Sequence, residues 1–431
     1  MGNTLLDMGN CSDKCGRTQV KRKPGNIPEE PPSPPITTPK GQRLIENLKL
    51  GRKQSNDNLT DKYEIDRENP LGRGIGGWVY KAVHKDSGQY YAVKHLKTEG
   101  IANNFRKMDD LRTELKLMIE MDHPHIVKLC EVIEAPDGFH LIQELSTGGE
   151  LLKRINEVGF TEDAARGHIL TMINTLRYLH DKKIVHCDLK PENWLFDEEG
   201  ENARLRLIDF GFSKHLGGAQ NLTIKRGSTL YLAPEVFAGK YDAQADMWSL
   251  GVIGFMMLFQ KAPFCGMVDE KVNLKATSEL IKAGKYEFPP ETSVSEDAQG
   301  FIKGLLTVDP SVRMTAAESQ QHAWLKAAYD ASVETNKEAL PPKLTGRMKS
   351  FSDLTSLQRT VTQVLAYMLE SEQIKTLRDE FEKLDETRNG EVSYQEFENA
   401  FKRSSIDLDK DDLQQAFNSI GKYDRMRQKF S

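Results

Sequence analysis

The chain has 431 residues, a length that suggests two to three domains, and 38% of them are hydrophobic, which is ample for a large core. The net charge of −5 gives no reason to expect nucleic acid as a partner. The longest apolar run, residues 251–259, is far below the roughly 18 residues of a membrane span. The five cysteines lack zinc spacing, and no apolar signal segment follows the start, so we expect a reduced, cytoplasmic protein.

The N-terminal region is polar and rich in proline, asparagine and lysine. Its run 28–39 (PEEPPSPPITTP) can form neither a helix nor a central strand, so we expect residues 1–60 to be a disordered arm. Gly2 and Gly9 each follow a methionine, as in N-myristoylated proteins, although Leu6 stands where Ser or Thr is wanted. One myristoyl chain holds a membrane only marginally. A membrane surface reached through N-terminal acylation and a plain tail are therefore both open.

A glycine-rich segment lies in the first strand-like region, which runs from Tyr63 to Leu96. Glycine lets a backbone approach phosphates without a Cβ clash, so this segment fits a phosphate-binding hairpin, with an ordinary hairpin turn as the alternative. Lys94 on the following strand would reach the α- and β-phosphates of a nucleotide, and Glu114 in the next helix would fix its position. A solvated lysine and an exposed glutamate are the alternatives. The residues of the hairpin that would contact the nucleotide are Leu71, Gly72, Gly74, Gly77 and Val79.

Hydrophobic periodicity predicts the elements that follow. We expect a helix at 106–121, strands at 126–134 and 140–144, and mostly helical structure from 151 to 325. The apolar run at 251–259 is predicted to be part of a buried helix.

Residues 186–193 (HCDLKPEN) place a base, a cation and an amide at fixed offsets in one loop. Phosphoryl transfer uses such a trio: Asp188 takes a hydroxyl proton, Lys190 offsets phosphate charge and Asn193 holds a metal. Two apolar strand residues then precede Asp209, which opens the sequence DFG and would chelate Mg²⁺.

This loop resembles the catalytic loop of Ser/Thr protein kinases, and the companion motifs follow in the order of that family over residues 63–325. The resemblance implies an α+β fold with the two lobes of a protein kinase domain, which uses ATP and Mg²⁺ to phosphorylate Ser or Thr of proteins. It further implies that backbone groups of Glu144 and Ser146 hydrogen-bond adenine, and that Arg313 pairs with Glu235. The purine ring would lie between Val79, Ala92 and Leu195.

Three residues bear on the substrate by the same resemblance. Glu150 and Glu192 match carboxylates that, in basophilic kinases, bind arginine upstream of the target, and solvated glutamates are the alternative. Ser228 aligns with the residue that contacts the base and favours Ser/Thr acceptors. Cys187 departs from the family, where arginine is usual and its guanidinium binds an activation-loop phosphate. A thiol cannot do so, and we therefore expect phosphorylation of Thr223 to have a weak effect.

Residues 385–396 (DETRNGEVSYQE) fit a twelve-residue EF-hand calcium loop. The first residue opens the loop, Gly390 makes its sharp turn, and the last closes it as a bidentate ligand. The candidate Ca²⁺ ligands are Asp385, Thr387, Asn389, Glu391, Ser393 and Glu396. Thr387 stands where an acid or amide is usual, so we expect modest affinity. A solvated polar turn is the alternative.

Around this loop we expect an autoinhibitory junction at 326–371, an EF-hand at 372–407 and an incomplete second EF-hand at 408–431, which lacks a closing glutamate. The junction contains an amphipathic helix at 350–369. This order of parts resembles the calcium-dependent protein kinases of plants and protists over about residues 60–420.

The resemblance to that family implies regulation by Ca²⁺, and a second EF-hand chain could complete the pair. The alternative from another class is a catalytically silent, calcium-responsive binding or scaffold protein. The presence of Lys94, Asp188 and Asp209 argues against it.

Overall fold

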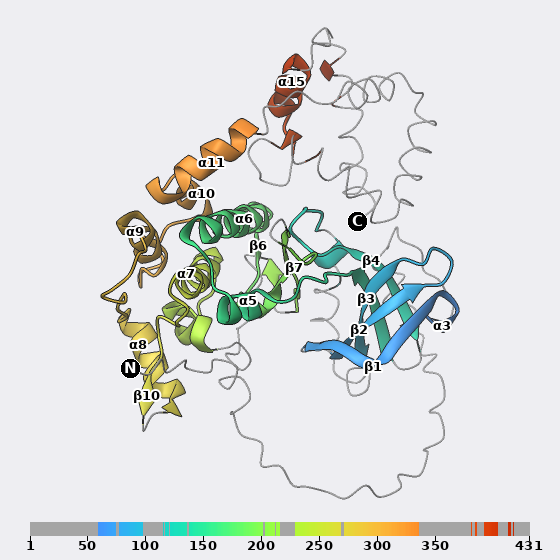
Figure 1. Ribbon diagram of the computed structural model, residues 1–431, viewed down its shortest axis with the longest axis horizontal. Helices are drawn as coiled ribbons and strands as arrows, with labels where there is room; N and C mark the ends of the chain where they lie inside the picture. The colour runs from blue at the N-terminus through green and yellow to red at the C-terminus, as the bar shows by residue number, and fades with distance from the viewer. Residues whose placement is uncertain are drawn as a thin grey trace, which may run out of the picture.

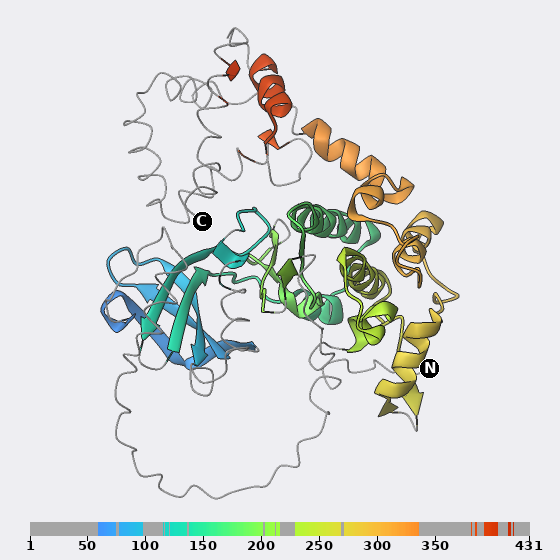
Figure 2. The ribbon, with the colours of Figure 1, turned by 180° about the vertical axis from the view of Figure 1, so that it is seen from behind.

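A two-lobed body forms the centre of the computed structural model, with a strand-rich lobe on one side and a helical lobe on the other (Figures 1 and 2). The predicted α+β kinase-like architecture is confirmed. The structure describes residues 59–74, 77–97, 115, 117–119, 121–135, 138–200, 203–211, 213–215, 229–268, 271–335, 381, 384–385, 392–403, 413–414 and 417.

The strand-rich lobe is built on one five-stranded antiparallel sheet in the order β1-β2-β3-β5-β4. Its strands are β1 (Tyr63–Gly74), β2 (Gly77–His84), β3 (Tyr90–Lys97), β4 (Leu129–Ala135) and β5 (Gly138–Glu144). Because β3 lies at the centre, Lys94 is flanked by Val79 of β2 and Leu141 of β5. Side chains alternate between faces along a strand, so Val93 and Lys94 point to opposite sides of the sheet.

One face of this sheet is covered by the short helix α3 (Leu59–Lys62). Leu59 is buried against an apolar cluster that includes Val93, and Lys62 Nζ lies 3.0 Å from a Glu131 carboxylate oxygen on β4. Leu59 and Thr60, the last two residues of the predicted arm, thus belong to this helix. Since the α3 face is closed by packing, the face that carries Lys94 is left for the site.

The helical lobe surrounds α7 (Ala243–Phe259), which is buried all round from Ala245 to Met257. The expectation of a buried helix for this apolar run is confirmed. Asp242 begins the helix by accepting a hydrogen bond from the Gln244 backbone N–H. In the described part of the chain, no helix is long and apolar enough to cross a membrane. The other helices of this lobe are α5 (Leu151–Glu157), α6 (Glu162–Asp181), α8 (Leu274–Ala283), α9 (Glu296–Leu305), α10 (Ala316–Gln320) and α11 (Ala323–Thr335).

Short elements between α6 and α8 shape the loops that carry the polar motifs. The hairpin of β7 and β8 and the pair of β6 and β9 flank the loop at 186–193. These elements are β6 (Ile184–Val185), η1 (Pro191–Asn193), β7 (Trp194–Phe196), β8 (Leu205–Leu207), β9 (Lys214–His215), η2 (Thr229–Tyr231), η3 (Pro234–Ala238), β10 (Met267–Val268) and β11 (Lys271–Val272).

Beyond the two lobes, the described part of the chain contains helix α15 (Tyr394–Arg403), drawn in red near the end of α11 (Figure 1). Its apolar face is formed by Phe397 and Phe401, which pack with Leu413 in a small cluster. The predicted amphipathic helix at 350–369 lies outside the described residues.

Candidate active site

The glycine-rich hairpin joins β1 to β2, with Gly72 opposite Val79 and Gly74 opposite Gly77. A Cβ on Gly72 would meet no atom within 4 Å, so this position is open. A Cβ on Gly77 would lie 1.8 Å from the His95 carbonyl oxygen, so glycine is required there by packing against β3. The two glycines therefore serve different purposes. Gly72 leaves space for a phosphate to approach the backbone, as predicted, whereas Gly77 is needed for packing against β3.

Lys94 and Asp209 form a buried ion pair in which Nζ lies 2.9 Å from Oδ1. Lys94 is 5% exposed. Burial alone would raise the pKa of Asp209, but the charge and hydrogen bond of Lys94, with a further bond from the Gly211 N–H, hold that pKa below its ordinary value. Asp209 is therefore ionised at neutral pH and faces the predicted phosphate-binding lysine.

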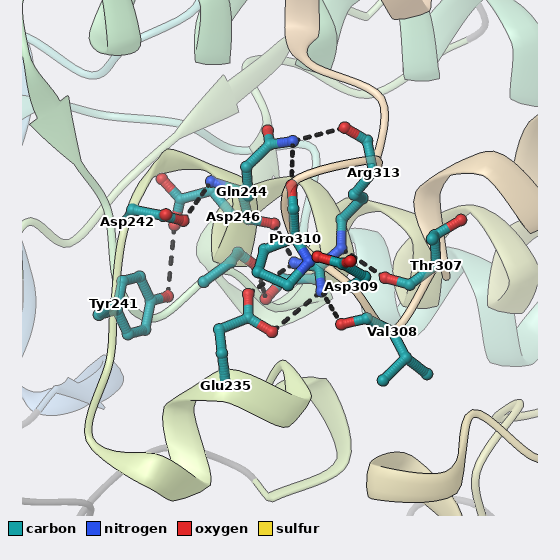
Figure 3. A network of polar contacts seen from close by, with 12 residues as sticks. Glu235, Tyr241, Asp242, Gln244, Asp246, Thr307, Val308, Asp309, Pro310 and Arg313 are labelled. Atoms are coloured by element: carbon teal, nitrogen blue, oxygen red, sulfur yellow. Dashed lines mark hydrogen bonds and ion pairs between the residues drawn. The ribbon is translucent and has the colours of Figure 1, made fainter.

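The Asp246 side chain of α7, which is fully buried, accepts hydrogen bonds from the backbone of the loop at 186–193. One oxygen accepts hydrogen bonds from the His186 N–H at 2.9 Å and from His180 Nε2 at 3.1 Å. The other accepts from the Cys187 N–H at 3.1 Å and from the Tyr241 hydroxyl at 3.4 Å. Figure 3 shows Tyr241 and Asp246 side by side.

This support is needed because the loop is strained. Within this loop, Cys187 has a φ of 68°, a left-handed conformation that costs a residue with a side chain about 1–3 kcal/mol. Asp209, outside the loop, has a φ of 64°. Burial first, and then the Asp246 carboxylate, raises the pKa of Tyr241 well above its ordinary value, so its hydroxyl stays a donor. The contacts of Asp246 thus fix the backbone that carries Asp188, the predicted base.

Asp188, Lys190 and Asn193 lie together on this loop and on η1. Lys190 Nζ lies 2.7 Å from Asp188 Oδ2. The Asn193 amide donates to the Asp188 backbone oxygen at 2.7 Å. Because Nδ2 is turned toward the loop, Oδ1 is the group that Asn193 can offer to a cation. The trio predicted from sequence is therefore brought together in space.

The residues present fit a bound Mg²⁺. Mg²⁺ prefers hard oxygen ligands, and usually takes one or two of them from the protein and the rest from phosphates and water. The ionised carboxylate of Asp209 and the side-chain oxygen of Asn193 are ligands of that kind. Asp209 accepts a hydrogen bond from Lys94, and the Asn193 amide donates one to the Asp188 backbone oxygen. Together they can hold the cation.

The segment that follows β5 lies where the two lobes join. Glu144 ends β5 and donates its backbone N–H to the Lys128 carbonyl oxygen at 3.1 Å. Ser146 Oγ is buried and has no hydrogen-bond partner within the described residues. Ala92 lies opposite Gln143, and Leu195 forms a bridge with Glu150. The predicted adenine contacts therefore come from both lobes.

Glu150 and Glu192 lie close enough to Lys190 to feel its charge. Burial raises the pKa of Glu192. The positive charge of Lys190 lowers this pKa, and the negative charges of Glu150 and Asp188 raise it further. Partial burial likewise raises the pKa of Glu150, again against the charge of Lys190. The two carboxylates and the catalytic loop thus share one electrostatic environment.

The segment that leads from Asp209 to η3, called the activation segment below, is anchored at its η3 end by Arg313, which is 1% exposed. Its two terminal nitrogens lie 2.7 and 2.9 Å from the two carboxylate oxygens of Glu235 (Figure 3). Further bonds run from Arg313 to the carbonyl oxygens of Thr307, Val308 and Gln244. The predicted ion pair between Arg313 and Glu235 is confirmed.

At the calcium loop, the structure describes the two ends. Asp385 and Glu396 are buried, at 3% and 4% exposure. Ser393 and Glu396 exchange hydrogen bonds, from the Ser393 N–H to Glu396 Oε2 at 2.7 Å and from the Glu396 N–H to Ser393 Oγ at 3.3 Å. Both carboxylates help to raise the pKa of Tyr329 on α11, after burial as the main cause. Buried carboxylates and a hydroxyl are the hard oxygen ligands that Ca²⁺ takes.

Several predicted residues lie outside the described part of the chain. They are Glu114, Thr223, Ser228, Thr387, Asn389 and Glu391. Within the described residues, no group of three or more His, Cys, Asp or Glu side chains could hold a metal. That finding excludes a zinc-type cluster among the described residues.

Sequence reasoning missed Tyr241 and Arg206. Tyr241 supports Asp246, and Arg206 of β8 pairs with Glu144 at 3.0 Å. A signal for Arg206 existed, because a charged residue between two leucines of a short buried strand needs a buried partner. No pattern indicated which partner that would be.

The fold and this set of contacts define a protein kinase, and comparison with known proteins agrees. A family model described as "Protein kinase domain" matches residues 65–325. Calcium-dependent protein kinase 5 of Plasmodium falciparum is 33% identical over 360 residues, which cover 83% of this chain and 61% of that protein. A CDPK-related protein kinase of Daucus carota is 33% identical over 376 residues, or 85% of this chain and 60% of that protein.

Calcium-dependent protein kinase 14 of Arabidopsis thaliana is 31% identical over 413 residues, which cover 94% of this chain and 75% of that protein. The chain belongs to the calcium-dependent protein kinase family. It spans about three fifths of the length of the first two of these relatives, at 61% and 60%.

Proposed function

We propose that this chain is a protein serine/threonine kinase that transfers the γ-phosphate of ATP to hydroxyl groups of protein substrates. One observation carries the proposal: a lysine, a base and two oxygen ligands from separate elements converge. Lys94 contacts Asp209 at 2.9 Å, Lys190 contacts Asp188 at 2.7 Å, and Asn193 donates to the Asp188 backbone. A silent binding protein would not need this arrangement.

In the proposed reaction, Asp188 accepts the hydrogen bond of the substrate hydroxyl and takes its proton. The hydroxyl oxygen forms a bond to the γ-phosphorus while the bond between that phosphorus and the β–γ bridging oxygen breaks, and ADP leaves. Lys190, 2.7 Å from the Asp188 carboxylate, orients the base and offsets charge on the transferred group. Lys94 binds the phosphates that stay with ADP.

Asp209 and Asn193 would hold Mg²⁺, which when bound supplies positive charge to the β- and γ-phosphates. Asp209 suits this purpose because its lowered pKa keeps it ionised. Asn193 keeps its oxygen available because its amide group is bound to the backbone of Asp188.

We further propose a preference for substrates with a basic residue upstream of the target. Glu150 and Glu192 are neighbouring carboxylates beside Lys190. Burial raises the pKa of each, and the guanidinium of a substrate arginine would stabilise their charged forms. Ser228, which lies outside the described residues, would help to select Ser/Thr acceptors.

We also propose that Ca²⁺ regulates this activity through the loop at 385–396, because the relatives are named as calcium-dependent protein kinases. The basic and apolar junction at 326–371 would block the substrate site until the EF-hand binds its helix. Thr387 weakens the loop, so we expect a reduced response unless a second EF-hand chain completes the pair. N-terminal acylation at Gly2 or Gly9 would add a membrane surface as a partner.

The proposed activity is tested by the fate of the label from γ-labelled ATP. The substrates are a peptide with arginine upstream of a serine, the same peptide with threonine or tyrosine in its place, and one with alanine. We expect label on serine and threonine and none on the alanine peptide. Equal label on all four peptides, or label on tyrosine alone, would contradict the proposal.

A further inference from the structure

A buried ion network lies behind the segment that joins the two lobes. Arg206 of β8 places Nη1 3.0 Å from Glu144 Oε2 and Nη2 3.4 Å from Asp197 Oδ2. The side chains are nearly inaccessible, at 10% exposure for Arg206, 4% for Glu144 and 9% for Asp197. One guanidinium therefore holds two carboxylates that come from different lobes.

The backbone around this network binds the same two segments to each other. Thr147 donates its N–H to the Asp197 carbonyl oxygen at 3.0 Å, and Gly148 donates to the Phe196 carbonyl oxygen at 2.9 Å. Gly148 has no space for a side chain, because a Cβ would lie 2.0 Å from the Glu198 carbonyl oxygen. The residues after Glu144 thus run directly along the end of β7.

Arg206 lies next to two of the predicted adenine contacts, Leu195 and Glu144. It lies opposite Leu195 in the β7–β8 register, and it fixes the side chain of Glu144, whose own backbone is an expected adenine contact. Without a cation, the carboxylates of Glu144 and Asp197 would be two buried negative charges side by side, which disfavours this geometry. The backbone of Glu144 would then move with its side chain.

We propose that Arg206 is a positioning residue for nucleotide recognition, which orients the backbone of Glu144 toward the adenine edge through the buried pair. The proposal rests on the proposed use of ATP. Arg206 itself touches no substrate. Its loss should therefore raise the KM for ATP about tenfold and change kcat much less, because the groups at the phosphates and at the base are untouched.

The test compares ATP with purine riboside triphosphate, which lacks the 6-amino group whose N–H would donate a hydrogen bond to the Glu144 carbonyl oxygen. For Arg206→Met we expect the KM for ATP to rise about tenfold and the KM for the analogue to stay the same, so that the preference for ATP is lost. Arg206→Lys should be intermediate, because an ammonium cannot bind two carboxylates in a planar fork. Glu144→Gln should reproduce the loss, and the double variant should add little to it.

Arg154→Met is the matched control. The Arg154 guanidinium lies 3.8 Å over the Phe196 ring and donates to the Gly200 carbonyl oxygen, so it supports the same hairpin without reaching Glu144. We expect this variant to keep the wild-type preference for ATP. Equal increases in KM for both nucleotides in Arg206→Met, or full additivity with Glu144→Gln, would overturn the proposal.

Two measurements keep the outcome clear. If Arg206→Met does not fold, as judged by thermal unfolding, Arg206→Lys and Glu144→Gln carry the test. Calorimetric titration of the full chain with ATP and with the analogue gives dissociation constants without any transfer step. A wild-type chain that binds ATP without preferring it would overturn the proposal on Arg206, whereas one that binds and prefers ATP but transfers nothing would overturn the proposed kinase activity alone.

Discussion

At the scale of single residues, the site depends on charges placed in contact before any substrate arrives. Lys94 is buried and Asp209 is partly buried, and the charge of Lys94 at 2.9 Å keeps Asp209 ionised despite that burial. A preformed arrangement of this kind needs little reorganisation when phosphate charge develops. We therefore expect the loss of Lys94 to lower the rate of phosphoryl transfer more than it lowers the stability of the fold.

Lys94→Met should therefore lower kcat by a factor of 100 or more, on the order of 3 kcal/mol in the barrier, while the fold is retained. The measurement is steady-state phosphoryl transfer together with thermal unfolding. Lys62→Met is the matched control, because it removes a lysine ion pair with Glu131 on the α3 face of the same sheet. Near-normal turnover in folded Lys94→Met would show that another group binds the phosphates.

The carboxylates of Glu150 and Glu192 give a pH dependence whose sign follows from their raised pKa. A raised pKa means that these groups are protonated at a higher pH than ordinary glutamates, so their attraction for arginine is lost on mild acidification. We expect the KM of an arginine-containing peptide to rise as the pH falls, and that of a neutral peptide to stay the same. The variant carrying Glu150→Gln and Glu192→Gln should show no such difference. A difference that persists in this variant would assign peptide recognition to other residues.

The roles and contacts of the site residues could be predicted from the sequence where the residues belong to one short motif. Asp188, Lys190 and Asn193 lie within a single loop, and their contacts follow from that loop's conformation. Arg206 was not predictable in its role, because its partner Glu144 lies 62 residues away and only the fold brings the two together. Glu114, which falls outside the described residues, stays a prediction.

At the scale of elements, α7 holds the catalytic loop through Asp246 and the end of the activation segment through its first turn. Figure 3 shows Gln244 of α7 beside Arg313, which lies between this helix and Glu235 of η3. Arg313 is almost fully buried, and its guanidinium donates hydrogen bonds to the Glu235 carboxylate and to three carbonyl oxygens. Removing it would leave the Glu235 carboxylate without its cation.

Arg313→Met should lower the free energy of unfolding by about 3–5 kcal/mol, the usual loss when one partner of a buried ion pair is removed. Chemical denaturation of the full chain measures this. Lys326→Met, which removes a surface pair with Asp330, should change stability by less than about 0.5 kcal/mol. A loss of under about 1 kcal/mol for Arg313→Met would mean that the pair does not anchor the segment.

Element types were largely predictable and their ends were not. The strand predicted at 126–134 is β4, which begins at Leu129, because Ile126 instead forms an isolated bridge with Leu207 of the other lobe. The strand predicted at 140–144 begins at Gly138. Helix α3, with four residues, is too short to show a periodic pattern, and tertiary packing of Leu59 decides that it forms.

At the scale of the whole molecule, the proposed calcium response requires the EF-hand and the kinase domain to be coupled. The carboxylates of Asp385 and Glu396 act on Tyr329 of α11, so the two ends of the predicted calcium loop lie near this helix, most of which belongs to the predicted junction. We therefore expect that Ca²⁺ binding to this loop, or deletion of the loop, changes the activity of the kinase domain.

We expect a chain that ends at Pro341 to be more active without Ca²⁺ than the full chain, because it lacks the predicted amphipathic helix of the proposed blocking junction. We also expect Glu396→Gln to abolish whatever Ca²⁺ activation the full chain has, since the bidentate ligand is lost. Activity against free Ca²⁺ measures both, with Glu398→Gln on the same helix as the control. A truncated chain no more active than the full one would argue against a blocking junction.

The central claim, phosphoryl transfer with Asp188 as the base, is tested most directly by separating nucleotide binding from transfer in Asp188→Asn. Asp188 lies on the catalytic loop next to Lys190 and has no predicted contact with the adenine or with the phosphates of ADP. For this variant we expect an ADP dissociation constant within about twofold of wild type and a transfer rate lower by a factor of 100 or more. Wild-type transfer in this variant, or a wild-type chain that binds ADP and transfers nothing to any peptide, would contradict the central claim.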